Sequence, residues 1–590
     1  MTESVHLRLA LAQINPTVGD VDGNAELISE AIGGARDAGA QLVLLPELCL
    51  SGYPPEDLLL RGDFLHAVRA SLESLAGEVS GIVALVGFPE RAERTDHPPP
   101  NPMIDPLVPP AHNSLAVLAE GEVAAIYRKI RLPNYGVFDE RRYFEPGEAP
   151  ALIEVDGALV GLTICEDIWV PGYPESEEAA AGAQLVVNAS ASPYNRGKGA
   201  AREEMVAARA RAHGATFALC NAVGGQDELV FDGRSVVVTP TGETLSRATE
   251  FEPEMLVADL LVAAPVEGTG DGSSSTVPVI ARLGSGAEAG HEGESRLAPP
   301  LEREEDEVYA ALTVGLRDYV EKNDFETVVI AISGGIDSAL VALLAVDALG
   351  PDRVRLVVMP SPHSSEGTQA DARTIAANLG AELIEIPIDE PMGAYEQALR
   401  ASFAGTEPGL AEENIQARIR GNLVMALSNK FGWLVLTTGN KSELSVGYAT
   451  LYGDMAGGFA VIKDIFKLLV YRLVRWRNER EGRELVPVSV LERPPSAELR
   501  AEQLDEDSLP PYETLDRILE GYVERDEGIE ALVAQGLPRD TVEEVIRLVD
   551  RAEYKRRQAP PGIRVSAKAF GRDRRLPITN RFGSMRALPR

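Results

Sequence analysis

Short runs of apolar and β-branched residues, separated by turn residues, recur along the first 262 positions and predict strands with helices between them. Residues 24–38 have a helical period, with Asp22 or Asn24 as the expected N-cap, and Glu120-Gly121 indicates a hairpin turn. The predicted strands are Leu7–Ile14, Leu42–Leu45, Ile82–Gly87, Ser114–Leu118, Val123–Tyr127, Val160–Cys165, Leu185–Asn188, Thr216–Cys220 and Ser235–Thr239. Elements in this order favour packed layers over an all-β barrel.

A different alternation begins near residue 301. An amphipathic helix is expected at 301–322, followed by strands that alternate with helices, at 327–332, 354–359, 382–388 and 433–438. That order is typical of a doubly wound parallel α/β sheet. We therefore expect two domains, 1–264 and 301–590.

Two stretches have the composition of loops or linkers. Residues 265–299 are rich in Gly, Ser, Glu and Pro and have little periodicity, so we expect a linker at 265–300 with one ordered stretch, Val277–Leu283. The prolines of residues 95–112 predict a surface loop.

Composition narrows the class of protein. The net charge of −35 argues against a duplex nucleic-acid partner. Three cysteines cannot form a disulfide framework, which fits the reducing cytoplasm, and no Cys/His spacing suggests a zinc site. We expect no membrane partner, because no apolar run is long enough for a spanning helix and the start, MTESVHLRLALAQI, lacks the layout of a signal peptide.

The last forty residues reverse the charge of the chain. Residues 551–590 contain 12 Lys or Arg against Glu553 and Asp573, a net of 12 − 2 = +10. Such a tail suits an anionic ligand, or it is a solvated tail that balances acidic neighbours.

A glycine loop follows the predicted strand at 327–332. Residues 331–338 read AISGGIDS and are followed by an apolar helical stretch. Glycines let the backbone approach a charged group, and a helix N-terminus attracts anions. The loop has no lysine and does not match GxxxxGK[ST]. It resembles the pyrophosphate loop of ATP pyrophosphatases, although a glycine turn before a core helix is the plainer alternative.

A carboxylate, an ammonium and a thiol stand at predicted strand ends in the first half. Glu47 follows LVLLP, Lys129 follows the 123–127 strand, and Cys165 ends LVGLTIC. A thiol becomes a nucleophile with a nearby base, and an ammonium stabilises an oxyanion. Taken singly, the cysteine could be a buried apolar group and the lysine a surface charge.

Together with their flanking segments, these residues resemble the nitrilase, or carbon–nitrogen hydrolase, superfamily. The matching segments are LPELCLSGYPPEDLL, YRKIRLPNYGVFDERRYFEPG and LTICEDIW. The resemblance implies an αββα sandwich, with Glu47 as general base, Lys129 as oxyanion stabiliser, Cys165 as nucleophile and Glu140 as a supporting glutamate; Cys49 and Cys220 match no catalytic position. The positions that match glutamine contacts are Tyr53, Tyr135, Phe138, Glu166, Ser192 and Lys198.

The second half resembles the NAD synthetase family in ENIQARIRG (413–421), TTGNKSELSVGYATLYGDMAGGFAVIKDIFK (437–467), PPSAELR, LPPYETLD and GIRVSAKAFGRDRRLPITN. Fused to a nitrilase half, it is similar to the glutamine-dependent members of that family. The implied ATP contacts are Ser333, Gly334, Gly335, Ile336, Asp337, Ser338, Thr438 and Lys467. The implied deamido-NAD contacts are Asn414, Glu443 and Lys568, and the implied Mg²⁺ ligands are Asp337 and Glu443, with Asp454 a weaker candidate and Arg418 a plausible phosphate contact.

The resemblance implies a ligase with ATP as co-substrate and a homo-oligomer. Because ammonia free in neutral water would mostly be protonated and lose its nucleophilicity, the fusion of the two halves also leads us to expect an enclosed passage for ammonia. Three alternatives stay open at this point. The chain could be another ATP-pyrophosphatase amidotransferase that aminates a purine nucleotide, a nitrilase-like scaffold without catalysis, or a stand-alone amidase, although the last leaves SGGIDS unexplained.

Overall fold

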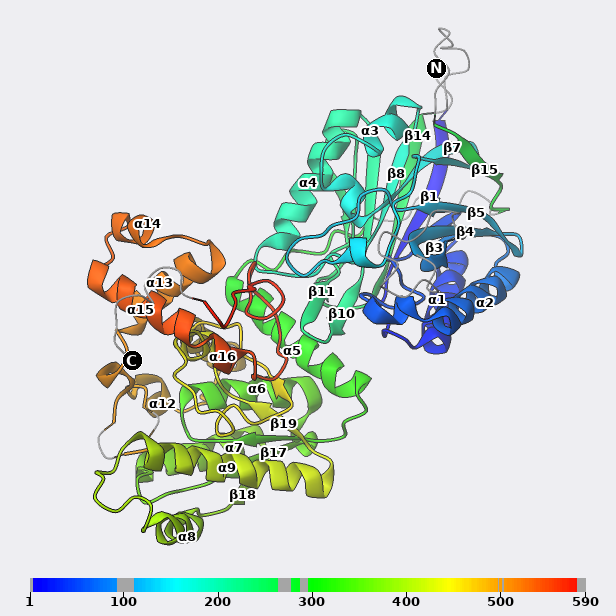
Figure 1. The fold of residues 1–590 in the computed structure, drawn as a ribbon. Coiled ribbons are helices and arrows are strands. Elements are labelled where there is room, and N and C mark those ends of the chain that lie inside the picture. The colour runs from blue at the N-terminus through cyan, green and yellow to red at the C-terminus, as the bar shows by residue number, and fades with distance from the viewer. Residues whose placement is uncertain are drawn as a thin grey trace. The chain divides into compact units, whose positions relative to one another are not determined.

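The structure of the chain is a computed structural model that describes residues 4–92, 111–263, 277–286, 295–496, 498–500 and 503–580. It has two compact units (Figure 1). The first consists of Met1–Gln226 and Val230–Glu302, and the second of Asp227–Leu229 and Arg303–Arg590. Among the helices described, none combines the length and apolar character needed to cross a bilayer.

The first unit contains two large sheets. One has the strand order β14-β1-β2-β3-β4-β5 and the other β13-β12-β9-β8-β7-β6-β15. The strands of the first sheet are β1 Ser4–Gln13, β2 Leu42–Leu44, β3 Val83–Arg91, β4 Ala111–Ala119, β5 Glu122–Arg128 and β14 Glu254–Ala263. Those of the second are β6 Leu152–Val155, β7 Ala158–Ile164, β8 Leu185–Ser190, β9 Thr216–Asn221, β12 Val236–Val238, β13 Thr244–Arg247 and β15 Val279–Leu283. A small hairpin is formed by β10 Val223–Gln226 and β11 Leu229–Asp232.

The alternation of side chains along the strands builds four layers. In β1, Leu7, Leu9 and Leu11 join a core shared with β7 and β8 of the other sheet, whereas Ala10 and Ala12 face the helices α1 Val21–Asp37 and α2 Gly62–Glu78. Helix α4 Lys198–His213 covers the outer face of the second sheet (Figure 1). The short α3 Glu175–Ala180 contacts β7 and β8. This arrangement confirms the predicted αββα sandwich.

Each predicted strand of this unit overlaps an observed one, but three local predictions are wrong. Helix α1 starts at Val21 and is capped by Asp20, whose carboxylate accepts from Gly23 N at 3.1 Å. The expected cap Asn24 instead pairs with the Thr17 backbone at 2.8 Å in both directions. Strand β7 ends at Ile164, so Cys165 lies in the following turn, and residues 111 and 112 of the proline-rich segment begin β4. The rest of the proline-rich loop, 95–110, and most of the linker lie outside the described residues.

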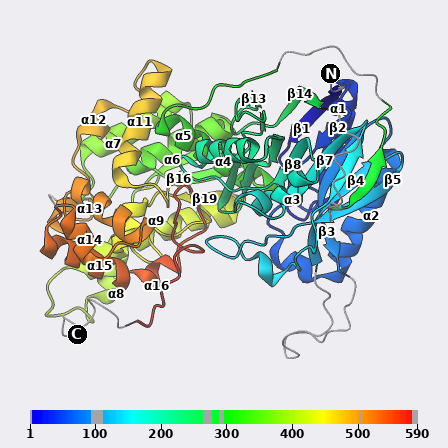
Figure 2. The ribbon, with the colours of Figure 1, turned by 90° about the horizontal axis from the view of Figure 1, so that it is seen from above.

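The second unit is built on a parallel sheet of order β18-β17-β16-β19-β20, which confirms the doubly wound fold. Its strands are β16 Val328–Ala331, β17 Val354–Val358, β18 Glu382–Glu385, β19 Leu434–Thr437 and β20 Phe459–Ala460. Figure 2 shows α5, α6 and α11 on one side of β16 and β19, and α9 on the other. The helices are α5 Glu304–Lys322, α6 Ile336–Leu349, α7 Glu366–Leu379, α8 Asp389–Leu399, α9 Leu410–Phe431, α10 Lys441–Val446, α11 Lys467–Glu481, α12 Val488–Glu492, α13 Tyr512–Leu519, α14 Ile529–Ala534, α15 Arg539–Arg551 and α16 Glu553–Arg556.

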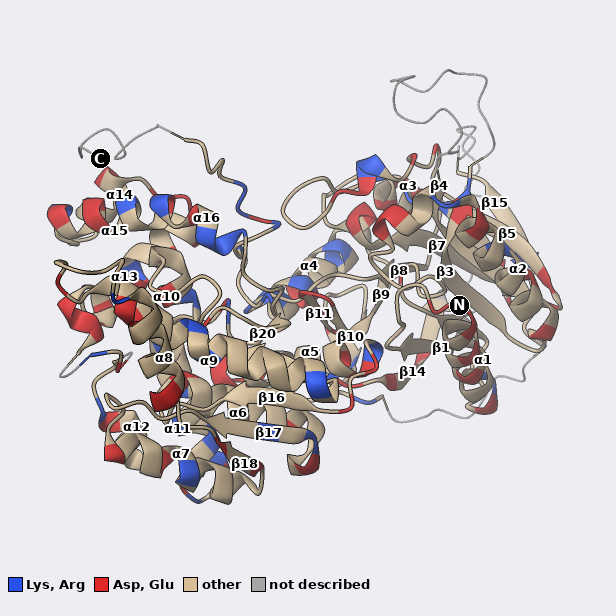
Figure 3. Ribbon diagram, turned by 60° about the horizontal axis from the view of Figure 1, so that its bottom comes forward, with Lys and Arg blue, Asp and Glu red and all other residues tan. Residues whose placement is uncertain are grey.

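The basic C-terminal segment contacts acidic groups of its own unit. Lys568 Nζ donates to Asp526 Oδ2 at 2.6 Å, and Arg564 Nε donates to Asp573 Oδ2 at 2.7 Å. The blue of Lys and Arg follows α16 and the chain beyond it (Figure 3). Both pairs fit the interpretation that the tail balances acidic neighbours.

Helix α3 places the carboxyl group of Glu178 against β7. Glu178 is fully buried, and its carboxyl oxygens lie away from solvent beside the backbone of Ala151 and Leu162. A Cβ added at Gly161 would lie 2.7 Å from Glu178 Oε2, which shows how closely the two pack. Burial, and then the nearby Asp167, raise the pKa of Glu178 well above its ordinary value.

Changing Glu178→Gln should therefore make the protein more stable at high pH. The unfolded state ionises Glu178 above its ordinary pKa, while the folded state keeps it neutral, so the wild type loses stability as pH rises from about 4.5 toward the raised pKa. We expect similar unfolding curves at pH 5 and a variant more stable by about 1–3 kcal/mol at pH 8 in guanidinium titrations. The exposed neighbour Glu177→Gln is the control; an equal gain for both variants would contradict the prediction.

Candidate active sites

Three polar side chains of the first unit lie where strands end. Glu47 follows β2, Lys129 follows β5 directly, and Cys165 opens a turn of 3-10 helix, Cys165–Ile168, directly after β7. All three are buried, with exposed fractions of 1% for Glu47, 0% for Lys129 and 4% for Cys165. Buried charges of this kind require partners.

Lys129 is the centre of the network that supplies them. Its Nζ donates to Glu47 Oε1 at 2.6 Å and to both oxygens of Glu140 at 2.9 Å. Glu47 also accepts from Asn113 Nδ2 at 2.8 Å and from the Ala191 backbone N–H at 3.0 Å. The structure therefore brings together Glu47, Lys129 and Glu140, which lie far apart in the sequence.

Burial and neighbouring charges have opposing effects on the pKa values of Cys165, Lys129 and Glu140. Burial raises the pKa of the Cys165 thiol and Glu47 raises it further, whereas Lys129 and the Ser190 side chain lower it. Burial lowers the pKa of Lys129, but Glu140 and Glu47 outweigh that effect and hold it well above its ordinary value. Burial raises the pKa of Glu140 to about 7, with Lys129 opposing and Glu47 reinforcing the rise. A thiol that resists ionisation in isolation needs a base, and the Glu47 carboxylate is near enough for its charge to act on the thiol.

Asp167 ties the cysteine turn to the lysine loop, and sequence reasoning missed it. Its Oδ2 accepts from Ile164 N and from Tyr127 Oη, each at 2.9 Å, and its Oδ1 accepts from Arg131 N at 2.8 Å. Cys165 itself has a positive φ of 40°. Asp167 is part of the CEDIW segment, but its role could not be predicted from the sequence. It accepts from backbone N–H groups more than thirty positions away, and no residue spacing indicates such bonds.

The expected glutamine contacts surround this network. Tyr53 Oη donates to Glu140 Oε1 at 3.1 Å, and Tyr135 Oη donates to Glu166 Oε2 at 3.0 Å. The Phe138 ring meets the Tyr135 ring edge to face at 5.4 Å.

The remaining two contacts stand on the chain that leaves β8. Lys198 Nζ donates to Pro193 O at 2.8 Å and lies 5.4 Å from the Trp169 ring centroid. Ser192 is buried and directly follows Ala191, whose N–H bonds Glu47. The structure thus connects these two residues to the same end of the sheet as the cysteine.

The second unit contains a cavity of about 310 Å³ at the carboxyl ends of its strands. It is lined by all the expected ATP contacts: Ser333, Gly334, Gly335, Ile336, Asp337, Ser338, Thr438 and Lys467. Gly334 has a φ of +82°, and a Cβ there would lie 2.0 Å from Thr368 O, so only glycine fits without a shift of the loop. Within the loop, the Ser333 and Gly335 N–H groups donate to Ser338 Oγ and Ser333 Oγ, each at 3.2 Å.

Two carboxylates of the cavity share one lysine. Lys467 Nζ donates to Asp337 Oδ2 and to Glu443 Oε1, the latter at 3.2 Å, and Asn440 Nδ2 donates to Asp337 Oδ1 at 2.8 Å. Burial and the charge of Asp337 raise the pKa of Glu443 to about 8 against the opposing charge of Lys467. In the residues described, no three His, Cys, Asp or Glu side chains form a metal-binding group, so a cation here would draw further ligands from water or phosphate.

Other expected contacts fall at or beyond the edge of this cavity. Glu443 and Asp454 line it, and Asp454 also caps a turn by accepting from Thr450 N at 2.6 Å. Asn414 does not line the cavity but accepts from Thr450 Oγ1 at 2.8 Å, and Thr450 does line it. Lys568 is held by Asp526, and Arg418 bonds Leu451 O at 3.2 Å.

The cavity also has lining residues that sequence reasoning missed. They include Arg420, Arg493 and Asp505. Arg420 stands in the ENIQARIRG segment, which could have identified it, whereas Arg493 and Asp505 lie outside the segments that carry the resemblance. Asn440, whose side chain donates to Asp337, was also missed. It caps α10 in an N-x-x-E capping box, in which the Asn440 side chain accepts from Glu443 N and the Glu443 side chain accepts from the Asn440 backbone N–H. That sequence pattern could have identified it.

Each of the two units matches a known protein family. The family model described as carbon-nitrogen hydrolase matches residues 8–264, and the one described as NAD synthase matches residues 308–559. The glutamine-dependent NAD(+) synthetase of Thermotoga maritima is 47% identical over 587 residues, covering 98% of this chain and 99% of the relative. The protein of the same name from Aquifex aeolicus is 45% identical, covering 98% and 100%.

Solved structures agree over the full length. The glutamine-dependent NAD+ synthetase from Acinetobacter baumannii, solved in complex with ADP, is similar with a TM-score of 0.73 and 37% identity, covering 98% of this chain and 99% of that one. The corresponding protein from Cytophaga hutchinsonii has a TM-score of 0.78 at 22% identity, with 98% of each chain covered, which supports the fold alone.

Proposed function

The chain belongs to the family of glutamine-dependent NAD(+) synthetases, and on that premise we propose which of its residues perform each half of the reaction. The enzyme is a carbon–nitrogen ligase that uses glutamine as amide donor. One observation carries the assignment: a buried Glu47–Lys129–Cys165 cluster and a phosphate-binding type of loop occur on one chain. We assign glutamine hydrolysis to a domain at 1–264 and synthesis to a domain at 301–590, with 265–300 as linker.

In the first domain, the Cys165 thiol attacks the side-chain amide carbon of glutamine while Glu47 accepts the thiol proton. The Lys129 ammonium, held between Glu47 and Glu140, stabilises the negative oxygen of the tetrahedral intermediate. Glu47 gives its proton to the leaving nitrogen, and ammonia departs. Water then adds to the thioester, Glu47 takes its proton, and glutamate leaves as the thiol is restored. Tyr53, Tyr135, Phe138, Glu166, Ser192 and Lys198 are assigned to holding the glutamine.

In the second domain, the nicotinate carboxylate of deamido-NAD attacks the α-phosphorus of ATP and pyrophosphate leaves. Ammonia then displaces AMP from the acyl-adenylate and forms the nicotinamide. The donors of the Ser333–Ser338 loop, Thr438 and Lys467 are assigned to the ATP phosphates. Asn414, Glu443 and Lys568 are assigned to deamido-NAD, of which Glu443 lines the cavity.

Asp337 and Glu443 fit a magnesium ion by the chemistry of their donors. Hard carboxylate oxygens suit Mg²⁺, which takes one or two of them and completes its shell with water and phosphate oxygens. When bound, the ion would neutralise phosphate charge. Lys467 balances both carboxylates in the absence of such a cation.

We also expect the enzyme in the reducing cytoplasm, because Cys49, Cys165 and Cys220 are all free thiols. We also expect a homo-oligomer, because nitrilase-type domains commonly self-associate.

The test is a reaction of purified enzyme with deamido-NAD, ATP, Mg²⁺ and glutamine. We expect NAD, AMP, pyrophosphate and glutamate in equal amounts. Formation of ADP, or turnover of xanthosine monophosphate in place of deamido-NAD, would reject the assignment and favour another ligase.

A further inference from the structure

The chain that leaves β8 presents three consecutive residues to the cysteine cluster. Ser190 ends β8 directly after Ala189, which is in register with Ile164, the residue before Cys165. The Ala191 N–H donates to Glu47 Oε2 at 3.0 Å, and Ser192 is the assigned glutamine contact. All three residues are buried. Nucleophile, base and substrate therefore depend on the placement of this one segment, Ser190–Ser192.

Asn221, at the end of the neighbouring strand β9, clamps that segment. It is in register with Ser190 in the parallel pairing of β8 and β9. Ser192 N donates to Asn221 Oδ1 at 2.8 Å, and Asn221 Nδ2 donates back to Ser192 O at 3.4 Å. A single side-chain amide thus contacts both the donor and the acceptor of the Ser192 backbone.

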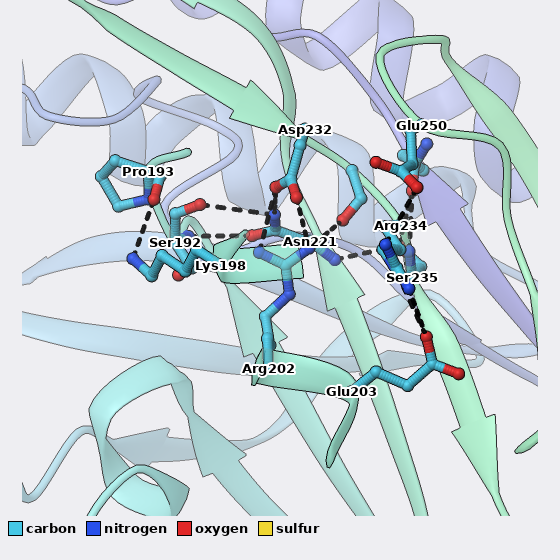
Figure 4. A network of polar contacts seen from close by, with 12 residues as sticks. Ser192, Pro193, Lys198, Arg202, Glu203, Asn221, Asp232, Arg234, Ser235 and Glu250 are labelled. Carbon is cyan, nitrogen blue, oxygen red and sulfur yellow. Dashed lines mark hydrogen bonds and ion pairs between the residues drawn. The ribbon is translucent and has the colours of Figure 1, made fainter. Parts of the chain in front are cut away.

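A buried ion pair fixes which way that amide points. Asn221 Nδ2 donates to Asp232 Oδ1 at 3.1 Å, so a flipped amide would direct its oxygen at a carboxylate. Arg202 holds Asp232 with two bonds of 3.0 Å, and both side chains are only 1% exposed (Figure 4). Paired in this way, the two charges can stay buried while they orient a neutral side chain.

We propose that Asn221 and Asp232 are positioning residues of the glutamine-hydrolysing half, which hold the Ser190–Ser192 segment in place for Glu47 and glutamine. The inference rests on the proposed function. A displacement of about 1 Å at a reacting group costs on the order of 100-fold in rate, so a loosened segment should slow glutamine hydrolysis without touching the synthetase unit.

The matched control stands beside these residues. Arg234 and Glu250 form a buried pair at 3.0 Å, with exposed fractions of 7% and 8% (Figure 4). Among the residues that the structure describes, neither side chain is hydrogen-bonded to residues 190–193. Changing Glu250→Gln removes one charge from a comparable environment. It should alter stability without altering glutamine kinetics.

Two variants at Asn221 test the proposal. Asn221→Leu should lower kcat/KM for glutamine by about 10–100-fold and leave ammonium-driven NAD synthesis within about twofold of wild type. Asn221→Asp keeps the acceptor for Ser192 N but can donate to Asp232 only when protonated. Its glutamine activity relative to wild type should therefore be higher at pH 6 than at pH 8, a change that a fold defect would not produce.

Wild-type glutamine kinetics in Asn221→Leu would overturn the proposal, as would a loss of the same size in Glu250→Gln. If Asn221→Leu does not fold, a flat activity ratio between pH 6 and pH 8 in Asn221→Asp overturns it instead. The proposed function is judged separately, because its failure would appear as wild-type enzyme that makes no NAD from glutamine.

Discussion

A Cys165→Ala enzyme should make no measurable NAD from glutamine and should still make it from ammonium salts. The change removes the thiol on which the charges of Glu47 and Lys129 act, and loss of a covalent nucleophile typically costs at least about 10⁴-fold in rate. The described residues that line the synthetase cavity all belong to the second unit, so ammonium-driven turnover should stay within about twofold of wild type. The measurement is NAD formation with each nitrogen source, together with glutamate release.

The control is Cys220→Ala, which removes an equally buried free thiol from the same unit. Cys220 lies in β9 within the core between the sheets, so its loss should affect stability and not nitrogen source. Loss of both activities in Cys165→Ala would reject separable sites. Retention of glutamine-driven synthesis would reject Cys165 as the nucleophile.

An Asp337→Asn enzyme should show the opposite pattern. The change keeps the shape of the side chain and an acceptor for Asn440, but it removes one of the two carboxylates that flank Lys467. We expect NAD synthesis to fall by about 100-fold or more with either nitrogen source, since the site would lose a charge needed where phosphate and cation meet. Glutaminase activity should persist, measured as glutamate released.

Asp347→Asn provides the comparison, because it makes the same change on the same helix, α6. Asp347 pairs with Arg477 at 2.7 Å and lies outside the cavity lining. If both variants lose synthesis equally, the effect belongs to the helix and not to the site. Full synthesis by Asp337→Asn would exclude the residue from ATP or metal binding.

The chain's alternation of apolar and polar residues predicts much of the framework. It places strand ends beside Glu47, Lys129 and Cys165, and the structure has β2, β5 and β7 ending at Leu44, Arg128 and Ile164. It also predicts β16 before the glycine loop, because a buried parallel strand is a continuous β-branched run.

The partners of those residues could not be predicted in the same way. Asn113, Asp167 and Asn221 act through side-chain hydrogen bonds to groups far along the chain, and no spacing marks such bonds. Strand β14 is missed for a related reason: its partner β1 lies about 250 positions away, so only tertiary packing shows that it belongs to the sheet. The predicted cap of α1 is wrong because Asp and Asn are both good N-cap residues. Asn24 is hydrogen-bonded to the Thr17 backbone, and Asp20 caps the helix instead.

The absence of a side chain at Gly334 has a mechanical consequence. Its backbone rests on the Thr368 carbonyl, in the first turn of α7, so the phosphate loop takes its position from that helix. Two further contacts hold this part of α7. Thr368 Oγ1 donates to Glu498 Oε2 at 2.9 Å, and Arg493 forms an ion pair with Asp371. The loop, Arg493 and Glu498 therefore all contact the N-terminal part of α7, so a displacement of that part of the helix would move the phosphate loop with it.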